Sequence, residues 1–253
     1  MKYAVSLILI LLTSLSFAGA IQETRYLKLS ADGIDLMAVR CGAGFLKVRG
    51  VADRGEINVT AQIEINGIKG SELKEFIQKN LVLKLQKHEN TAILQSEFKK
   101  AELVDSEAKI DLTLEVPAKI DLKIDDGSGS ITVRNLSGNL EIEDESGSIT
   151  IRNIMGEVRV EDSSGGIVIE DIRGNVMIND GSGRISIELV KGDVKVKDGT
   201  GSMTIQDIDG NVTVTDGSGG IAINNVKKNV FIREAGSGAV HIERVKGKVT
   251  TRD

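Results

Sequence analysis

Three consecutive stretches, VRVEDSSGGIVIEDIRGN (158–175), VMINDGSGRISIELVKGD (176–193) and VKVKDGTGSMTIQDIDGN (194–211), align residue for residue at a step of 18. The same step continues on both sides of them, because Asp recurs at positions 126, 144, 162, 180, 198 and 216. A seventh copy stays in alignment only with one additional residue near Ala235. Self-similarity at a fixed short period is typical of proteins that stack one structural unit on the next.

Within each copy, apolar and polar residues alternate, as in Ile131-Thr-Val133 and Leu140-Glu-Ile142. This alternation predicts β-strands with one buried face, so each copy supplies two strands separated by Gly-rich turns. One copy is too small to bury its own apolar face, so its strands must stack on the equivalent strands of the next copy. The sequence therefore predicts an all-β fold, a single-stranded parallel β-solenoid (β-helix) of about seven 18-residue coils.

The composition fits this fold and excludes several others. Apolar residues make up 40% of the chain but aromatic residues only 3%, so the core must be built from Ile, Val and Leu. The 28 Gly residues suit tight corners, whereas the single Pro excludes collagen and the single Cys excludes a disulfide scaffold. The mild net charge of −5 gives no electrostatic basis for a nucleic-acid partner.

The first half of the chain differs from the repeats. Residues 21–107 contain several strand patterns, such as 57–63 and 91–98, and one short helix pattern over 71–79. Because a solenoid needs a cover for its first open end, we expect this segment to be a mixed, mostly β cap. The predicted organisation is a signal peptide at 1–20, the N-terminal cap at 21–107 and the solenoid at 108–253.

The first twenty residues have the pattern of a secretory signal peptide. Lys2 precedes an apolar run that is short for a membrane span, and Ala18-Gly19-Ala20 is a small-residue cleavage site. Cleavage after Ala18 and an uncleaved anchor are the alternatives. We expect an exported protein, periplasmic or extracellular at the cell surface, with no membrane span in the mature chain. Cys41 would then have no disulfide partner, and we expect it to be a buried small side chain.

A family resemblance rests on residues 112–133, which read LTLEVPAKIDLKIDDGSGSITV, and on GNLEIE at 138–143. This run resembles the bacterial "putative adhesin" domain family, which consists of exported repeat β-helix proteins of poorly known activity. The resemblance covers most of the chain after residue 20 and is strongest from 110 to 253. It implies a β-helical fold and an envelope location, and it brings no motif of catalytic residues.

The Asp column is the sharpest candidate for a site. Equivalent carboxylates about 4.8 Å apart repel one another, so something must compensate. A Ser or Thr two residues after each Asp favours an Asx-type turn, in which the carboxylate accepts a hydrogen bond from the hydroxyl or from a backbone N–H. The functional alternatives are a glycosidase-like carboxylate pair and a cation-binding ridge formed by Asp126, Asp144, Asp162, Asp180, Asp198 and Asp216.

No catalytic, metal or cofactor motif accompanies this column. His88 and His241 have no Cys or Ser partner at a motif spacing, and no helix follows the Gly-x-Gly corners, as a phosphate site requires. We therefore expect no catalytic residues, no bound metal and no cofactor.

These observations predict an exported, adhesin-like β-solenoid with a structural, adhesive or envelope-surface binding role. Its expected partner is an envelope or cell-surface protein or glycan. One alternative is a polysaccharide-active β-helix enzyme, although such enzymes usually carry long loops and these coils have no insertions. Another is a filament-forming β-helix scaffold. Because Lys246, Lys248 and Arg252 charge the last coil, we expect a monomer or limited dimer instead.

Overall fold

The computed structural model describes residues 15–17, 20–67, 72–99 and 107–252. They form two compact units that divide between Gly129 and Ser130, within strand β9 (Asp121–Leu136). Most of the predicted signal peptide (1–14 and 18–19) and residue 71, the expected start of the helix, lie outside the described residues. None of the described helices is long and apolar enough to cross a membrane.

The first unit is built mainly of long strands. β2 (Ala20–Ser30) pairs antiparallel with β5 (Glu56–Asn66), which pairs antiparallel with β8 (Glu107–Pro117). The short β1 (Leu15–Phe17) adds to the start of β2. Helix α1 (Leu73–Asn80), predicted over 71–79, leads into an antiparallel hairpin of β6 (Leu81–His88) and β7 (Thr91–Phe98).

Parallel pairing begins within the first unit. β3 (Leu36–Ala43) lies parallel to β7 and also to residues 121–128 of β9, and β4 (Leu46–Val51) lies parallel to β8. The core of this unit is aliphatic and includes Met37, Leu46, Leu94 and Leu112, each at most 1% exposed. The mixed, mostly β character predicted for 21–107 is confirmed, whereas its role as a cap stays a prediction.

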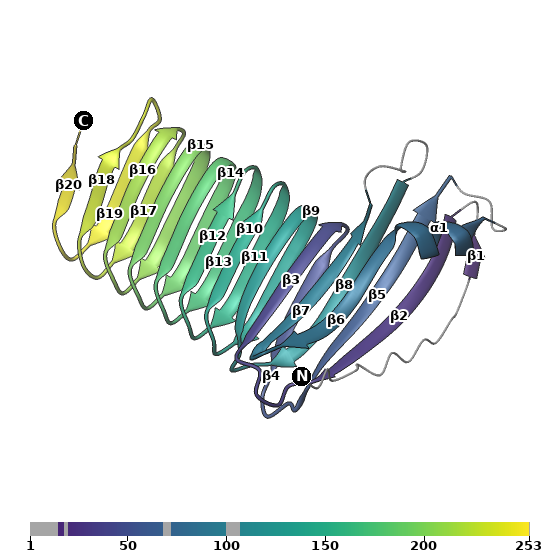
Figure 1. Cartoon of the computed structure of the whole chain (residues 1–253). Coiled ribbons are helices and arrows are strands. Elements are labelled where there is room, and N and C mark those ends of the chain that lie inside the picture. The colour runs from purple at the N-terminus through teal and green to yellow at the C-terminus, as the bar shows by residue number, and fades with distance from the viewer. Residues whose placement is uncertain (1–14, 18–19, 68–71, 100–106, 253) are drawn as a thin grey trace. The chain divides into compact units, whose positions relative to one another are not determined.

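The second unit is a regular solenoid with two rows of parallel strands. The first row consists of β10 (Leu140–Asp144), β12 (Val158–Asp162), the first parts of β14 (Val176–Val190) and β15 (Val194–Ile208), β16 (Val212–Ser218), β18 (Val230–Glu234) and β20 (Val249–Thr251). The second row consists of β11 (Gly147–Ile154), β13 (Gly165–Ile172), the second parts of β14 and β15, β17 (Ile221–Val226) and β19 (Val240–Val245). Figure 1 shows these coils stacked in chain order. The predicted all-β solenoid fold is confirmed.

The strand register equals the sequence period. Val176 pairs with Val194 and Ile187 with Ile205, each 18 residues further on. The step becomes 19 at the seventh copy, because Val214 pairs with Ile232 but Thr215 pairs with Glu234. The additional residue predicted near Ala235 is thus taken up as a bulge at Arg233, two positions earlier.

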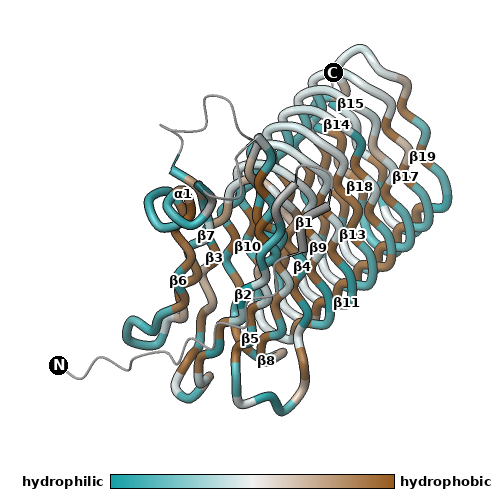
Figure 2. The backbone as a smooth tube through the Cα atoms, turned by 90° about the vertical axis from the view of Figure 1, so that its right-hand side faces the viewer, coloured by the Kyte–Doolittle hydropathy of each residue, from teal (hydrophilic) through white to brown (hydrophobic). Residues whose placement is uncertain are grey.

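The apolar columns of the repeat form the core of the second unit. Residues such as Ile151, Ile169, Ile187 and Ile205 are fully buried one above the other. Figure 2 shows the same hydrophobic positions recurring coil after coil between pale or hydrophilic corners. The stacked apolar columns, and not any single contact, therefore hold each coil to the next.

One corner of the coil differs from the Gly corners that the sequence predicted. At the Gly corner, Gly147 to Gly219 have φ between 141° and 151°. The other corner places a residue other than Gly in the left-handed region, with φ between 53° and 63°, at Asn135, Asn153, Asp171, Leu189, Asp207, Asn225 and Arg244. Asn and Asp suit this corner because their short polar side chains tolerate that conformation.

Candidate functional site

The Asp column lies inside the coil wall instead of on an exposed ridge. In β12 the buried residues are Val158, Val160 and Asp162, so strand alternation places the carboxyl group on the core side. All six Asp residues of the column are buried, between 1% and 6% exposed. This burial follows because the repeat continues the inward alternation of the two apolar residues before each Asp. Cation binding by the column stays an untested alternative, and the expected absence of a metal stays a prediction.

Backbone N–H groups close Asx-type turns at this column. The N–H of Ser164 donates to Oδ1 of Asp162 at 3.1 Å, and the N–H of Ser182 donates to Oδ1 of Asp180 at 3.1 Å. The Ser164 hydroxyl instead lies 3.5 Å from the carbonyl oxygen of Glu145. The turn predicted from the Asp-x-Ser pattern is therefore confirmed at these two coils, with the backbone as the donor.

Several carboxylate oxygens in the column accept no hydrogen bond. They are Oδ2 of Asp162 and Asp180 and both oxygens of Asp198 and Asp216. Burial raises the pKa of Asp162, Asp180 and Asp198 to about 6, and the charge of neighbouring Asp residues adds to this effect. Burial likewise raises the pKa of Asp216. Backbone N–H groups facing Asp198 offset part of the rise without reaching hydrogen-bond geometry.

Asp126 has different surroundings in the first unit. Burial raises its pKa to about 6, while hydrogen bonds from the Cys41 thiol and from the backbone N–H of Gly127, at 3.0 Å, lower it. Cys41 pairs in register with Asp126 on one side and with Ser96 on the other. Cys41 is half-buried, not fully buried as expected: it continues the inward alternation of Met37 and Val39 near the end of β3, where burial is no longer complete. Its partner is a carboxyl group.

No basic side chain is buried with the carboxyl groups in the described part of the chain. The described residues also contain no group of three or more His, Cys, Asp or Glu side chains arranged to hold a metal ion. The two His residues are exposed, and Nε2 of His241 lies 2.8 Å from Oε1 of Glu243. The structure thus brings neither His to the Asp column.

A ladder of amide and carboxylate side chains at another corner was missed from the sequence. Oδ1 of Asn175 accepts from the N–H of Asp193, Oδ1 of Asp193 from that of Asn211, and Oδ1 of Asn211 from that of Asn229, at distances between 2.7 and 3.3 Å. These residues follow one another at the repeat step of 18, so the signal was a polar column that alignment of the copies would have shown. The ladder satisfies backbone donors at a corner of successive coils.

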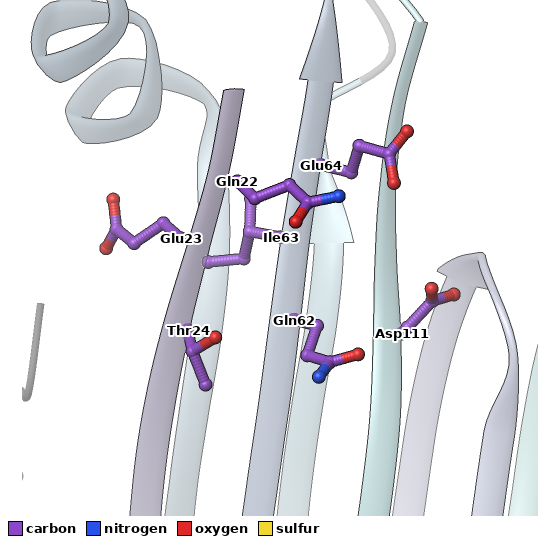
Figure 3. A pocket seen from close by; sticks show the side chains of 7 residues that line it. All are labelled: Gln22, Glu23, Thr24, Gln62, Ile63, Glu64 and Asp111. Atoms are coloured by element: carbon purple, nitrogen blue, oxygen red, sulfur yellow. The ribbon is translucent and has the colours of Figure 1, made fainter. Parts of the chain in front are cut away.

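A shallow polar hollow of about 150 Å³ lies on the first unit. It is lined by Gln22, Glu23, Thr24, Gln62, Ile63, Glu64 and Asp111. Figure 3 shows Gln22, Gln62, Glu64 and Asp111 reaching to the same side from β2, β5 and β8, whereas Glu23 points away. Amide and carboxylate groups on a sheet face can exchange hydrogen bonds with a polar ligand.

The carboxylates of this hollow already have partners. Nζ of Lys109 lies 3.4 Å from Glu64 and 3.6 Å from Asp111, and these two acids, Asp111 first, raise the pKa of Lys109. Oδ1 of Asp111 also accepts from the N–H of Phe45 at 2.9 Å. Glu23 pairs with Arg25 at 2.6 Å. The three carboxylates of the hollow are therefore all engaged, by two cations and a backbone N–H.

The last two coils carry a basic surface in an otherwise acidic chain. Residues 227–252 contain seven Lys or Arg and two Glu, a balance of +5 (7 − 2), whereas the whole chain carries −5. All seven basic side chains are exposed: Lys227, Lys228, Arg233, Arg244, Lys246, Lys248 and Arg252. We call this set the basic surface. From the sequence, the charges of the last coil predicted only protection of a strand edge.

A family model matches residues 51–250, which include most of both units. The chain belongs to the Toastrack DUF4097 family. This membership confirms the family resemblance noted at residues 112–133, and the β-helical fold of the Toastrack family agrees with the solenoid of the second unit. Toastrack membership names no activity, so the role of the chain must be argued from its surfaces.

Matches to solved structures extend along nearly the whole Toastrack chain. A "putative adhesin" from Bacteroides fragilis is 13% identical, with a TM-score of 0.48, and the match covers 91% of this chain and 97% of that one. A "putative lipid binding protein" from Parabacteroides distasonis is 16% identical, with a TM-score of 0.44 and coverage of 92% and 97%. A "putative cell adhesion protein" from Clostridium sporogenes is 11% identical, with a TM-score of 0.30 and coverage of 91% and 100%. No curated protein matches the sequence.

Proposed function

We propose that this Toastrack protein is exported and has an adhesive, envelope-surface binding role, without catalysis, in which it contacts an anionic glycan. The observation that carries the proposal is the basic surface, where seven exposed cations gather in a chain of net charge −5. A cluster of one sign attracts a partner of the opposite sign and raises the rate of encounter.

The spacing of these cations suits a linear polyanion. Lys227 and Lys246 occupy equivalent positions in successive coils, about 4.8 Å apart along the stack. Asp209 occupies the equivalent position one coil before Lys227. Its carboxylate lies 2.7 Å from Nζ of Lys227 and 3.2 Å from Nζ of Lys191. Lys227 and Lys246 thus place two positive charges one coil step apart, which can attract neighbouring acidic groups of a polymer such as an acidic polysaccharide.

The shape of the second unit supports binding without catalysis. Its coils are uniform, since the register changes by only one residue along the stack, and no long loop builds a cleft. The acids of the polar hollow are engaged by Lys109, Arg25 and a backbone N–H. Incubation with neutral and acidic polysaccharides, followed by a reducing-end assay, tests the rival enzyme hypothesis. Release of new reducing ends that depends on Asp111 would favour that rival.

Binding is tested with polygalacturonate as the acidic probe and dextran as the neutral one. The wild type should bind the acidic polymer, and the affinity should fall as salt rises because screening weakens exposed charges. The variant Lys227→Ser/Lys246→Ser should bind at least tenfold more weakly. The matched control Lys195→Ser/Lys197→Ser loses the same charge on another face and should bind normally. Equal loss in both variants, or equal binding to dextran, would refute the proposed surface.

Export is tested separately by fractionating cells that produce the full chain. The mature protein should be found in the envelope or medium, and N-terminal sequencing should show cleavage near Ala20. Retention of the full chain in the cytoplasm would contradict the envelope role, whatever the result of the glycan assay.

A further inference from the structure

Four buried carboxyl groups stand in register in the second unit. Asp162 pairs with Asp180, Asp180 with Asp198, and Asp198 with Asp216, all between parallel strands. Parallel neighbours lie about 4.8 Å apart, so equivalent side chains stack at that repeat. We call these four residues the Asp ladder.

The surroundings of the Asp ladder provide no positive charge. Glu161, Asn179, Lys197 and Thr215 precede its members on the same strands, and alternation directs them to the outer face. The second row of strands, which includes β13 and β17, contributes buried aliphatic side chains to the same core. The turn that follows each Asp of the ladder contains only Ser, Thr and Gly. The titratable groups that act on Asp162, Asp180 and Asp198 are therefore neighbouring members of the column, including Asp144 beside Asp162, and backbone N–H groups face all four ladder carboxyls.

The oxygen atoms of the ladder need hydrogen-bond donors. Oδ2 of Asp162 and Asp180 and both oxygens of Asp198 and Asp216 accept none, although each side chain is at least 94% buried. An ionised carboxylate has only acceptors, so a stack of ionised groups leaves these atoms unsatisfied. A protonated carboxyl has one O–H donor, which can bond to the carboxylate of the next coil.

We propose that the Asp ladder is a proton-binding site, in which neighbouring carboxyl groups share protons and donate O–H···O hydrogen bonds from coil to coil. Each proton comes from solvent as the coils stack, and it returns to solvent when they separate. The negative charge of the ladder is thereby reduced without a metal ion. The solenoid thus contains a device that couples the stacking of its coils to pH.

The sign of the coupling follows from the raised pKa values. The ladder carboxyls have pKa values of about 6 at Asp162, Asp180 and Asp198, above the ordinary value of 3.8. Between these values the folded chain holds more protons than the unfolded chain, so stability decreases as pH rises. The stabilisation is fully present below about pH 3.8 and lost above about pH 6. Each proton taken up on folding makes the unfolding constant rise tenfold per pH unit in this window.

The test compares urea unfolding of the purified protein at pH 5 and pH 8. The wild type should be more stable at pH 5, and Asp198→Asn should be more stable than the wild type at pH 8, because an amide has its own donor and no charge. The matched control is Asp207→Asn, at a half-buried corner position where other coils have Asn135, Asn153 or Asn225. It should keep the wild-type pH dependence. A wild type that is more stable at pH 8, together with a destabilised Asp198→Asn, would overturn the proposal.

Two further measurements keep the test decisive if Asp198→Asn fails to fold. Infrared spectra of the wild type at pH 6 should contain the carbonyl band of a protonated carboxylic acid, and its absence would refute proton sharing. Melting curves with millimolar calcium and with chelator should coincide. A calcium-dependent rise in the melting temperature would show that the Asp ladder binds a metal ion and not protons.

Discussion

Leu189 occupies the same corner of the coil as Asp171 one coil earlier, and the two residues have nearly the same left-handed φ, 59° and 58°. The Leu side chain is 45% exposed, so it gains little burial in return for this conformation. A residue of this type pays about 1–2 kcal/mol in the left-handed region, where Asn and Asp are tolerated.

Leu189→Asn should therefore stabilise the protein by about 1 kcal/mol. The reverse change at an equivalent corner, Asn225→Leu, is the matched control and should destabilise it by at least as much, because it also removes the hydrogen bond from Nδ2 of Asn225 to Oδ1 of Asp207. Urea unfolding followed by circular dichroism measures both. A stabilising effect of Asn225→Leu would show that exposed apolar contacts, and not the backbone conformation, decide this corner.

The Gly corner should be far less tolerant. Gly201 has φ of 151°, and a Cβ atom there would lie 1.7 Å from the carbonyl oxygen of Gly183 in the preceding coil. Because that obstacle is backbone, Gly201→Ala should cost on the order of 4 kcal/mol or prevent folding. Gly220→Ala is the control, since a Cβ atom there meets nothing within 4 Å. Thermal melting should separate the two variants, and equal melting temperatures would contradict the close approach of the coils.

The repeat made the second unit predictable from the sequence. The step of 18 fixed which residues pair, as in Val176 with Val194, and the alternation fixed which ones are buried. The same alternation also places Asp162 inward, although an ionisable residue is seldom fully buried. Asp162 is buried because its carboxyl group follows Val158 and Val160 on one strand face. The cost of burying this group appears as its raised pKa.

The first unit was less predictable because it has no repeat. Its strand patterns identified the elements, but the pairing of β3 with both β7 and β9 joins segments far apart in the chain. Local patterns carry no information on such pairing. The polar hollow was missed for the same reason, since Gln22, Gln62 and Asp111 come together only through the order β2, β5, β8.

Cys41 should tune the titration of Asp126. Its thiol donates a hydrogen bond to the carboxylate and lowers a pKa that burial raises to about 6. Cys41→Ala removes this donor, so the pKa of Asp126 should rise further, and the loss of stability with increasing pH should extend to higher pH. Carbon-detected NMR titration of the Asp126 carboxyl group measures the shift. Cys41→Ser keeps a donor and should stay close to the wild type; a lower midpoint in Cys41→Ala would contradict the hydrogen bond.

Asn211 joins three coils through its side chain. Its Nδ2 donates to Oδ1 of Asp193 at 3.2 Å, and its Oδ1 accepts from the N–H and Nδ2 of Asn229 at 3.3 and 3.1 Å. Asn211→Ala leaves the backbone donor of Asn229 unsatisfied and should cost about 1–3 kcal/mol. Asn211→Asp keeps the acceptor and should cost less, as Asp193 already serves at this corner. Urea unfolding orders the variants, and an Asp variant less stable than the Ala variant would show that charge repulsion outweighs the ladder.

Removal of one whole coil should be tolerated, whereas removal of half a coil should not. Deletion of 180–197 joins Asn179 to Asp198, so every column keeps its register, because β14 and β15 pair at a step of 18. Deletion of 180–188 joins Asn179 to Leu189, which places a corner residue where the buried Asp belongs and brings strands of the two rows against each other. We expect the first variant to be a shorter folded solenoid with a β-type circular dichroism spectrum and a cooperative melt. The second should lose the cooperative melt, because its remaining apolar columns no longer stack. Two variants that are equally folded, or equally unfolded, would show that the 18-residue register does not control the stability of the stack.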